Sequence, residues 1–220
     1  MLLLAGNVCQ PRVTPNVRAS SLQACCPIQQ STLLWIDEFV IGHRLCPWAS
    51  KSRHSDGFRL LTIDDASQFV DHTVAAATEL AGLPSSHSPW PTTLLVLNAS
   101  AARDVAFFAG LCRQASALTA EAAPSVDLLG FHPARIDTGP GCSANPDDAA
   151  HYSVRSPLPT VQLLRQDDLD AARRDYAVRR SSALAGALEL LYENKRRLRE
   201  IGSDVLREQL RALHTEVEQP

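Results

Sequence analysis

The stretch Thr92-Thr93-Leu94-Leu95-Val96-Leu97 decides the fold, because it is a continuous run of apolar and β-branched residues with no charged side chain. A run of this length without polar alternation is typical of a strand that is buried on both faces of a sheet. The proline-rich segment 84–91 precedes it as a loop, and helical periodicity follows at 101–121. The sequence therefore predicts a central strand at 92–97.

The neighbouring segments alternate between strand and helix patterns. Strands are expected at 58–63, 126–131 and 159–164, and helices at 31–42, 64–80, 101–121, 167–177, 182–201 and 203–217. The order α-β-α-β-α-β-loop-β-α-α indicates parallel strands joined by right-handed crossovers. It predicts an α/β fold, bordering on α+β, with a mixed sheet of about four strands packed with helices.

The chain divides into three parts. Residues 1–30 lack Asp and Glu but contain Arg12 and Arg18, a composition typical of a transit peptide; a merely disordered terminus is the alternative. We expect an organellar protein, plastid more than mitochondrion, and otherwise a cytoplasmic one. Residues 31–202 form the domain, and 203–220 a C-terminal helical extension.

Composition excludes several classes of protein. The net charge of -3 gives no basic field for nucleic acid. No apolar run approaches the ~20 residues of a membrane span, so we expect a soluble protein. The six cysteines form no C-x-x-C pair, which argues against a disulfide framework and against structural zinc, and favours a reducing compartment.

Five patches carry a resemblance to a known family: Val40-Ile41-Gly42 with Leu45-Cys46-Pro47-Trp48-Ala49, the strand 92–96, Phe131-His132-Pro133, the segment 146–165, and Asn194 with Leu198 and Gly202. In this order they resemble DUF1415, a domain of unknown function. The resemblance implies one α/β domain and no particular reaction. The chain departs from the family where Arg44, Arg135, Leu158 and Gln162 stand; the family tends to have His at the last of these positions.

The segment 132–156 between the third and fourth strands contains Gly139, Pro140, Gly141 and Pro146 and shows no regular periodicity. Irregular loops longer than ~12–15 residues in a compact domain are usually functional or disordered. We favour a functional loop.

Two residues are candidates for chemistry beside this loop. Cys46 follows a helix end and precedes Pro47, so it is either a reactive thiol near His43 and Arg44 or a buried structural cysteine. His132 follows the third strand, at the strand end where α/β sheets bind ligands. It is a general base, a metal ligand, or an imidazole that a loop carbonyl holds.

Asn194 lies in the helix expected at 182–201, beside an apolar stripe through Leu191, Lys195 and Leu198. An inward amide could orient His132 and complete a Cys46-His132-Asn194 set. The basic run 195–197 with Arg199 is interleaved with Glu193 and Glu200, which favours a solvated helix face.

Arg155 and Arg165 bracket the fourth strand and could together grip a phosphate or carboxylate, with Asp148 nearby. The alternative is that Arg155 pairs with Asp147 or Asp148 and orders the loop. A metal site would need Cys46, His132 and Asp148, and lacks the usual ligand spacing. We expect no metal and no cofactor.

Two functions remain open, and the sequence does not decide whether the protein is an enzyme. The first is a small-molecule enzyme with a Cys/His/Arg pocket for an anionic substrate. The second is a binding or assembly module, in which the helix 203–217 pairs with a partner or a second copy unless its leucines dock on the domain. Both depend on whether the Cys46 turn, the tip of the third strand and the fourth strand meet at one pocket.

Overall fold

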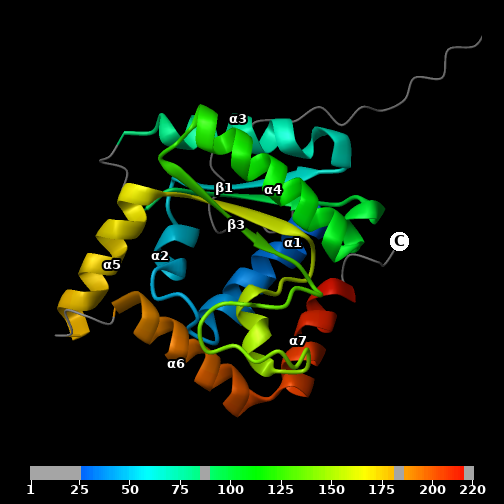
Figure 1. Ribbon diagram of the computed structural model, residues 1–220, viewed down its shortest axis with the longest axis vertical. Coiled ribbons are helices and arrows are strands. Elements are labelled where there is room, and N and C mark those ends of the chain that lie inside the picture. The colour runs from blue at the N-terminus through cyan, green and yellow to red at the C-terminus, as the bar shows by residue number, and fades with distance from the viewer. Residues whose placement is uncertain (1–25, 85–89, 181–185, 216–220) are drawn as a thin grey trace, which may run out of the picture.

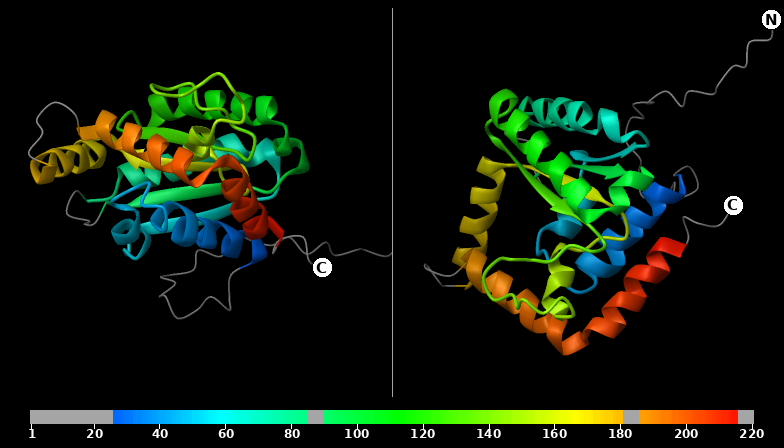
Figure 2. Two further views of the ribbon diagram at one scale, coloured as in Figure 1. Left: turned by 90° about the horizontal axis from the view of Figure 1, so that it is seen from below. Right: turned by 45° about the vertical axis from the view of Figure 1, so that its right-hand side comes forward.

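The computed structural model describes residues 26–84, 90–180 and 186–215. In them a four-stranded mixed sheet lies between helices on its two faces (Figure 1; Figure 2, left), which confirms the predicted α/β fold. Most of the segment expected to be a transit peptide or disordered, residues 1–25, lies outside the described residues.

The sheet has the order β1-β2-β4-β3. Its strands are β1 (Phe58–Ile63), β2 (Thr92–Leu97), β3 (Val126–Phe131) and β4 (Thr160–Arg165). β1 and β2 are parallel, whereas β4 runs antiparallel to both β2 and β3. All six residues of β2 are buried, which confirms the central strand predicted from its unbroken apolar run. The fourth strand begins one residue later than expected.

Helices α3 (Phe69–Ala81) and α4 (Val105–Ala122) cover one face of the sheet. Side chains that alternate along β2 and β4 point to this face because successive residues of a strand face opposite sides. The core of this face includes Phe69, Leu80, Leu95, Leu97, Phe108, Val161 and Leu163.

Helix α1 (Pro27–Leu34), the π-helix η2 (Trp35–Ile41), α6 (Gly186–Ile201) and α7 (Ser203–Thr215) build the core of the other face. This second core includes Leu33, Trp35, Phe39, Leu94, Leu198, Leu206, Leu210 and Leu213. The helix α5 (Gln166–Arg180) leaves the end of β4 and lies at the side of the sheet (Figure 1).

The first helix begins at Pro27, four residues before the expected start, and continues as the π-helix η2. Proline suits the first turn because its missing N–H would have no partner there. The N–H of Gly42 donates to Asp37 O at 3.2 Å, the wider spacing of a π-helix. A Cβ at Gly42 would lie 2.0 Å from Glu38 O, so only glycine fits this helix end.

Two details of the connections differ from expectation. A short helix, α2 (Ala49–Arg53), follows the Cys46 turn, and a 3-10 helix, η5 (Ala149–Val154), occupies the end of the long loop. Asp148 begins η5 because its carboxylate accepts from the N–H of Ala150 at 2.9 Å. The loop that was expected to be irregular therefore contains a segment of regular structure, η5.

Helix α7 docks on the domain. Leu206, Leu210 and Leu213 are buried among residues of α1 and η2, and the Ser31 hydroxyl donates to Leu213 O at 2.6 Å. The stripe that could have paired with a partner helix is used inside the chain. The last residues of the expected helix, 216–217, lie outside the described residues.

Candidate functional site

The turn that carries Cys46 has an unusual backbone. Arg44 has φ 55°, the left-handed region that residues other than glycine rarely adopt. Two residues later the Cys46 sulfur accepts the N–H groups of Trp48 and Ala49. These bonds lower the pKa of the thiol, but burial raises it by more. Cys46 is therefore held as a neutral thiol at neutral pH.

Two side chains of helix α6 hold this turn by hydrogen bonds. Asn194 Nδ2 donates to Leu45 O at 2.6 Å, and Arg197 donates to the carbonyls of His43 and Arg44 at 3.1 and 3.0 Å. Carbonyls beyond a helix end need donors from elsewhere, which these two side chains supply. The amide of Asn194 is thus bonded to the Cys46 turn and does not orient His132.

His132 lies in a different part of the molecule. Its ring packs on Phe108 of α4, and Nε2 lies 3.0 Å from Ala102 O. Because Nδ1 accepts the N–H of Ala134, Nε2 carries the proton and the ring is neutral. Burial also lowers the pKa of the imidazole.

Cys46 and His132 do not share a pocket among the described contacts. Leu45 packs in the core beneath α1 and η2, whereas Phe108 and His132 belong to the face beneath α4. The expected convergence of the first turn and the third-strand tip is therefore wrong, because the sheet separates them. Of the three roles considered for His132, the structure is nearest to the held ring, but the carbonyl that holds it is Ala102 O of the 3-10 helix η4 (Ser100–Arg103) rather than one of the loop.

The two arginines are also apart. Arg165 ends β4 and makes a two-point ion pair with Asp168 at 2.6 and 3.1 Å. Arg155 precedes the other end of β4, where it donates to the carbonyls of Arg135 and Pro146. They cannot grip one anion together. Arg155 does order the long loop, but through carbonyls rather than through Asp147 or Asp148.

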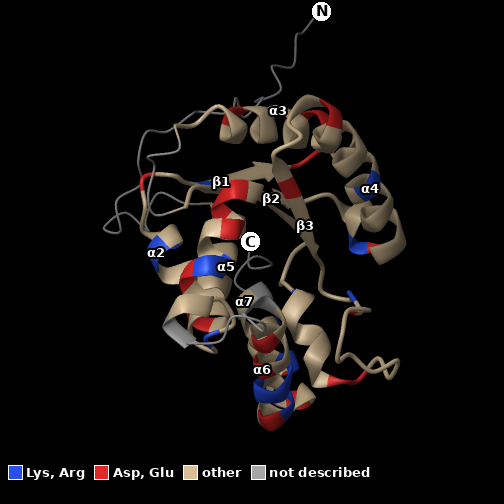
Figure 3. Ribbon diagram, turned by 60° about the vertical axis from the view of Figure 1, so that its left-hand side comes forward, with Lys and Arg blue, Asp and Glu red and all other residues tan. Residues whose placement is uncertain are grey.

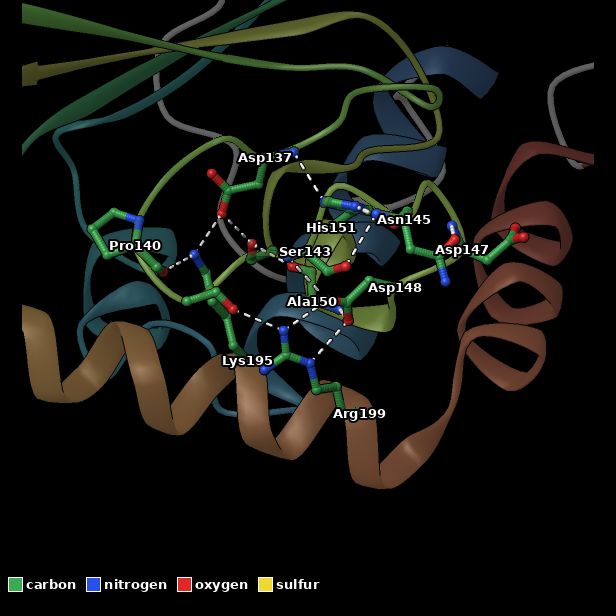
Figure 4. Close-up of polar contacts among 12 residues, drawn as sticks. Asp137, Pro140, Ser143, Asn145, Asp147, Asp148, Ala150, His151, Lys195 and Arg199 are labelled. Atoms are coloured by element: carbon green, nitrogen blue, oxygen red, sulfur yellow. Dashed lines mark hydrogen bonds and ion pairs between the residues drawn. The ribbon is translucent and has the colours of Figure 1, made fainter.

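The loop 132–156 is instead fastened to α6 by two basic residues one helical turn apart (Figure 4). Arg199 pairs with Asp148 through contacts of 2.6 and 2.9 Å and donates to Gly141 O at 2.7 Å. Its guanidinium holds the pKa of Asp148 well below the usual range. Lys195 donates to Pro140 O and pairs with Asp137 Oδ2 at 3.0 Å.

Lys195, Asp137 and Cys142 form one polar cluster under this loop. The side chain of Lys195 is 1% exposed and that of Asp137 is 15% exposed. Cys142 is partly buried, and the charges of both side chains act on its thiol. Its neighbours pull in opposite directions: Lys195 lowers the pKa of the thiol, whereas Asp137 and, above all, burial raise it. We call these three side chains the Cys142 cluster.

His151 supports the cluster from inside the loop. It is fully buried; its Nδ1 accepts the N–H of Asp137 at 3.1 Å and its Nε2 lies 2.9 Å from Asn145 O (Figure 4). This arrangement fixes the backbone of Asp137. Asp137 is held further by the N–H of Gly139, which donates to Oδ1 at 2.8 Å.

The outer side of the cluster is bounded by Gly141 and Tyr192. Gly141 has φ 78°, and a Cβ there would lie 2.7 Å from the Tyr192 ring, so both conformation and space require glycine. Tyr192 is 51% exposed and precedes Lys195 by three residues on α6. An exposed aromatic ring therefore lies next to the thiol-bearing turn.

Sequence reasoning missed most of this site. Basic and acidic positions are interleaved along α6 (Figure 3). The run 195–199 does contain a solvated part, since Arg196 is 69% exposed, but Lys195 is buried and Arg199 pairs with Asp148 of the loop. The position of Lys195 on the apolar stripe of its helix was the available signal. For Asp137 and Cys142 the irregular loop offered none.

A separate pocket of about 300 Å³ opens between α4, β3 and α5. Thr119, Asp127, Leu129 and Arg173 are among its lining residues, and it includes no member of the Cys142 cluster. Within the described residues, no group of three or more His, Cys, Asp or Glu is arranged to hold a metal ion. No helix in the same residues is long and apolar enough to cross a membrane.

Comparison with known proteins places the chain in a family without assigning it a reaction. No curated protein and no solved structure matches it. One family model does, described as a protein of unknown function (DUF1415), over residues 27–207. This range runs from the first residue of α1 into α7, so it takes in the Cys46 turn, the long loop and α6. Because the match covers most of the chain and both clamped loops, the protein belongs to the DUF1415 family.

Proposed function

We propose that the protein is a thiol-dependent enzyme that transfers or hydrolyses acyl groups of small amides or esters, with Cys142 as its nucleophile. The observation that carries the proposal is the buried ion pair of Lys195 and Asp137 beside the turn that bears Cys142, since both charges act on its thiol. A nucleophile needs a base to take its proton, and a developing oxyanion needs a positive neighbour. Asp137 and Lys195 can supply these two functions.

The protonation states suit this division of labour. Bonds from the Gly139 N–H and Lys195 lower the pKa of Asp137, so it is a carboxylate at neutral pH. The contacts of Lys195 with Cys142 and Asp137 outweigh its burial and raise its pKa, so it remains an ammonium. Cys142 rests as a thiol. Before the reaction, Cys142 is therefore the proton donor, Asp137 the proton acceptor and Lys195 the fixed positive charge.

The step begins when Asp137 takes the proton from Sγ as the sulfur attacks the carbonyl carbon of the substrate. The C=O electron pair moves to the oxygen, which the Lys195 ammonium stabilises. The intermediate then collapses, the leaving group takes the proton from Asp137, and a thioester on Cys142 remains. Water then attacks the thioester carbon and gives its proton to Asp137; the C–S bond breaks, the acid leaves, and the sulfur takes that proton back from Asp137.

This proposal replaces the Cys46-His132-Asn194 set, because the sheet separates His132 from the other two. It also leaves out the anion grip of Arg155 and Arg165, because the two lie at opposite ends of β4. The assembly module loses its main support, since the leucines of α7 are buried in the domain. Tyr192, exposed beside Gly141, is the residue best placed to contact a substrate.

The test is acylation by p-nitrophenyl acetate under reducing conditions. We expect a burst of p-nitrophenolate and a thioester that peptide mapping by mass spectrometry places on Cys142. Cys142→Ala should abolish both. The matched control is Cys112→Ala, because burial raises the pKa of Cys112 to about 11 and that thiol is largely protonated.

Two outcomes would overturn the proposal. One is an acyl group found on Cys46 or Cys112 instead of Cys142. The other is a burst in Cys142→Ala that equals the burst of the unchanged protein.

A further inference from the structure

Strand β3 lies at an edge of the sheet, because the order β1-β2-β4-β3 gives it a partner on one side alone. The pocket of about 300 Å³ contacts the consecutive residues 126–129 of this strand. Successive side chains of a strand point to opposite faces, so a pocket that all of them line lies against the edge of the strand. Residues of α4 and α5 supply most of its other walls. The pocket is therefore a groove beside the outer edge of β3.

The register of β3 against β4 shows which main-chain groups point into this groove. The Gln166 N–H donates to Ser125 O at 2.8 Å, which adds one pair to the antiparallel ladder of the two strands. Hydrogen-bonded pairs alternate along such a ladder, so the odd-numbered residues of β3 turn their N–H and C=O groups to β4. The even-numbered residues, Val126, Leu128 and Gly130, turn theirs outward.

Contacts at the two ends of the strand agree with this orientation. The Val126 N–H donates to Ala123 O at 2.9 Å, and the guanidinium of Arg135 donates to Gly130 O. Between these bonds lie Val126 O, the N–H and C=O of Leu128, and the Gly130 N–H. In the part of the chain that the structure describes, no group bonds to them. The outer edge is thus closed at both ends and open over the length of a short strand.

Two side chains of the groove also lack the surroundings that they would normally have. Thr119 of α4 is 1% exposed, and its hydroxyl has no hydrogen-bond partner among the described residues. Thr73 and Thr78 of α3, in contrast, donate to the carbonyl four residues earlier, as threonines inside helices do. A buried hydroxyl without a partner is unfavourable, which points to a ligand that completes it. Leu129 is 46% exposed although it belongs to a strand.

We infer that the edge of β3 binds a short extended peptide segment of a partner protein, which joins the sheet as an additional antiparallel strand. A row of alternating N–H and C=O groups is matched by another extended main chain. The antiparallel direction is the more stable one per residue. A second copy of this chain fits less well, because it would bring its own α4 and α5 against those of the first.

The walls of the groove specify two side chains of this segment. Residues directly opposite each other in a pair of strands point to the same face. The peptide residue opposite Leu128 therefore points toward α4, where a threonine or serine gives the Thr119 hydroxyl a partner. The peptide residue before it lies opposite Leu129 on the other face. An apolar side chain there covers the exposed leucine.

The third side chain is chosen by charge. The peptide residue that follows the threonine lies opposite Asp127. In the described residues this carboxylate accepts from the Gln166 amide at 3.1 Å and has no basic partner. Arg173, the basic residue of the groove, pairs instead with Asp170 at 3.1 Å. A lysine or arginine opposite Asp127 therefore completes the segment, which reads apolar, hydroxyl, basic.

The test adds the peptide acetyl-Ser-Leu-Thr-Lys-Ser-amide to the full chain and follows amide hydrogen exchange by NMR. Without peptide, the Leu128 N–H should exchange faster than those of Asp127 and Leu129, which bond to β4. Peptide at about ten times its Kd should slow exchange at Leu128 and Gly130 about tenfold, because only the unbound fraction exchanges. Fluorescence anisotropy of the labelled peptide gives the Kd.

Matched peptides test the pairing without any change to the protein. N-methylation of the threonine removes the N–H that donates to Leu128 O and should abolish binding, whereas N-methylation of the lysine, whose N–H points away from β3, should not. The reversed peptide, acetyl-Ser-Lys-Thr-Leu-Ser-amide, should bind about 2–5-fold more weakly, since it loses the lysine opposite Asp127. Asp127→Asn should weaken binding as much, and Asp71→Asn, an exposed change outside the groove, should not.

Several outcomes would overturn the inference. They are equal binding of the two methylated peptides, tighter binding of the reversed one, or no slowing at Leu128 at any soluble peptide concentration. Slow exchange at Leu128 before peptide is added would also overturn it: a second copy occupies the edge if dilution restores fast exchange, and the chain itself does if dilution has no effect. The groove contains no member of the Cys142 cluster, so these results do not depend on the acylation test.

Discussion

Asn194 and Lys195 are consecutive residues of α6, yet they hold two different loops. Asn194 bonds to Leu45 O at 2.6 Å in the Cys46 turn, while Lys195 pairs with Asp137 at 3.0 Å in the long loop. Consecutive side chains of a helix point about 100° apart, so one helix can clamp segments on two of its sides. Arg197 and Arg199 repeat the division one turn later. Helix α6 therefore determines the shape of both cysteine-bearing segments.

The first prediction concerns the buried ion pair of this clamp. Lys195→Met should lower the free energy of unfolding by about 3 kcal/mol, because removal of one partner leaves the Asp137 carboxylate largely buried and unpaired. Urea denaturation measures the change. The matched control is Arg196→Gln on the exposed side of the helix, where an ion pair contributes at most about 1 kcal/mol. Equal losses in the two variants would contradict the clamp.

The second prediction concerns helix α7. Leu206→Ala should lower the free energy of unfolding by about 2–5 kcal/mol, since Leu206 is 0% exposed in the core beside α1 and its truncation leaves a cavity. Its neighbour Val205 is 51% exposed, so Val205→Ala should stay within about 0.5 kcal/mol of the unchanged protein. Thermal or urea denaturation compares the two. If Leu206→Ala were as stable as Val205→Ala, α7 would not be part of the domain core.

The third prediction separates chemistry from folding at the Cys142 cluster. Asp137→Asn should slow the acylation of Cys142 by p-nitrophenyl acetate about 10²–10⁴-fold, the usual contribution of a general base. The Asn keeps the shape of the side chain but has no charge to accept a proton. Stopped-flow measurement of the burst gives the rate, and circular dichroism shows whether the fold is kept.

A base has a second signature, in the dependence of rate on pH. In the unchanged protein the burst rate should change little across neutral pH, because Asp137 is already a carboxylate there and takes the proton during the attack. In Asp137→Asn the reaction depends on thiolate that solvent generates, so the rate should rise steadily with pH. Asp147→Asn serves as the control: it loses a carboxylate of the same loop that is 77% exposed. A variant at Asp137 that acylates at the unchanged rate would exclude the proposed base.

The sequence predicts the sheet far better than the site, for a physical reason. The strand Thr92–Leu97 is buried on both faces, so six consecutive residues without a charge are enough to indicate its environment. The Cys142 cluster depends on contacts between an irregular loop and a helix some fifty residues later. The local spacing of apolar residues, which predicts helices and strands, gives no information on such contacts. Lys195 is the exception, because a lysine on an apolar stripe needs a buried partner. His132 shows the converse: its place after a strand suggested catalysis, but its neighbours hold both ring nitrogens.

The last prediction follows from that neutral imidazole. Desolvation lowers the pKa of His132 below the value of about 6.5 that it has in the unfolded chain. Between these two values the unfolded state binds the proton and the folded state does not, so stability is complete above pH ~6.5 and falls as the pH decreases. The slope for one such proton is at most about 1.4 kcal/mol per pH unit.

His132→Gln keeps a donor for Ala102 O without a titrating ring. The free energy of unfolding of this variant should therefore fall less between pH 7 and pH 5, about two units over which other groups titrate alike in both proteins. Urea denaturation at a series of pH values isolates the difference, and parallel curves for the two proteins would show that the folded state does not hold His132 neutral.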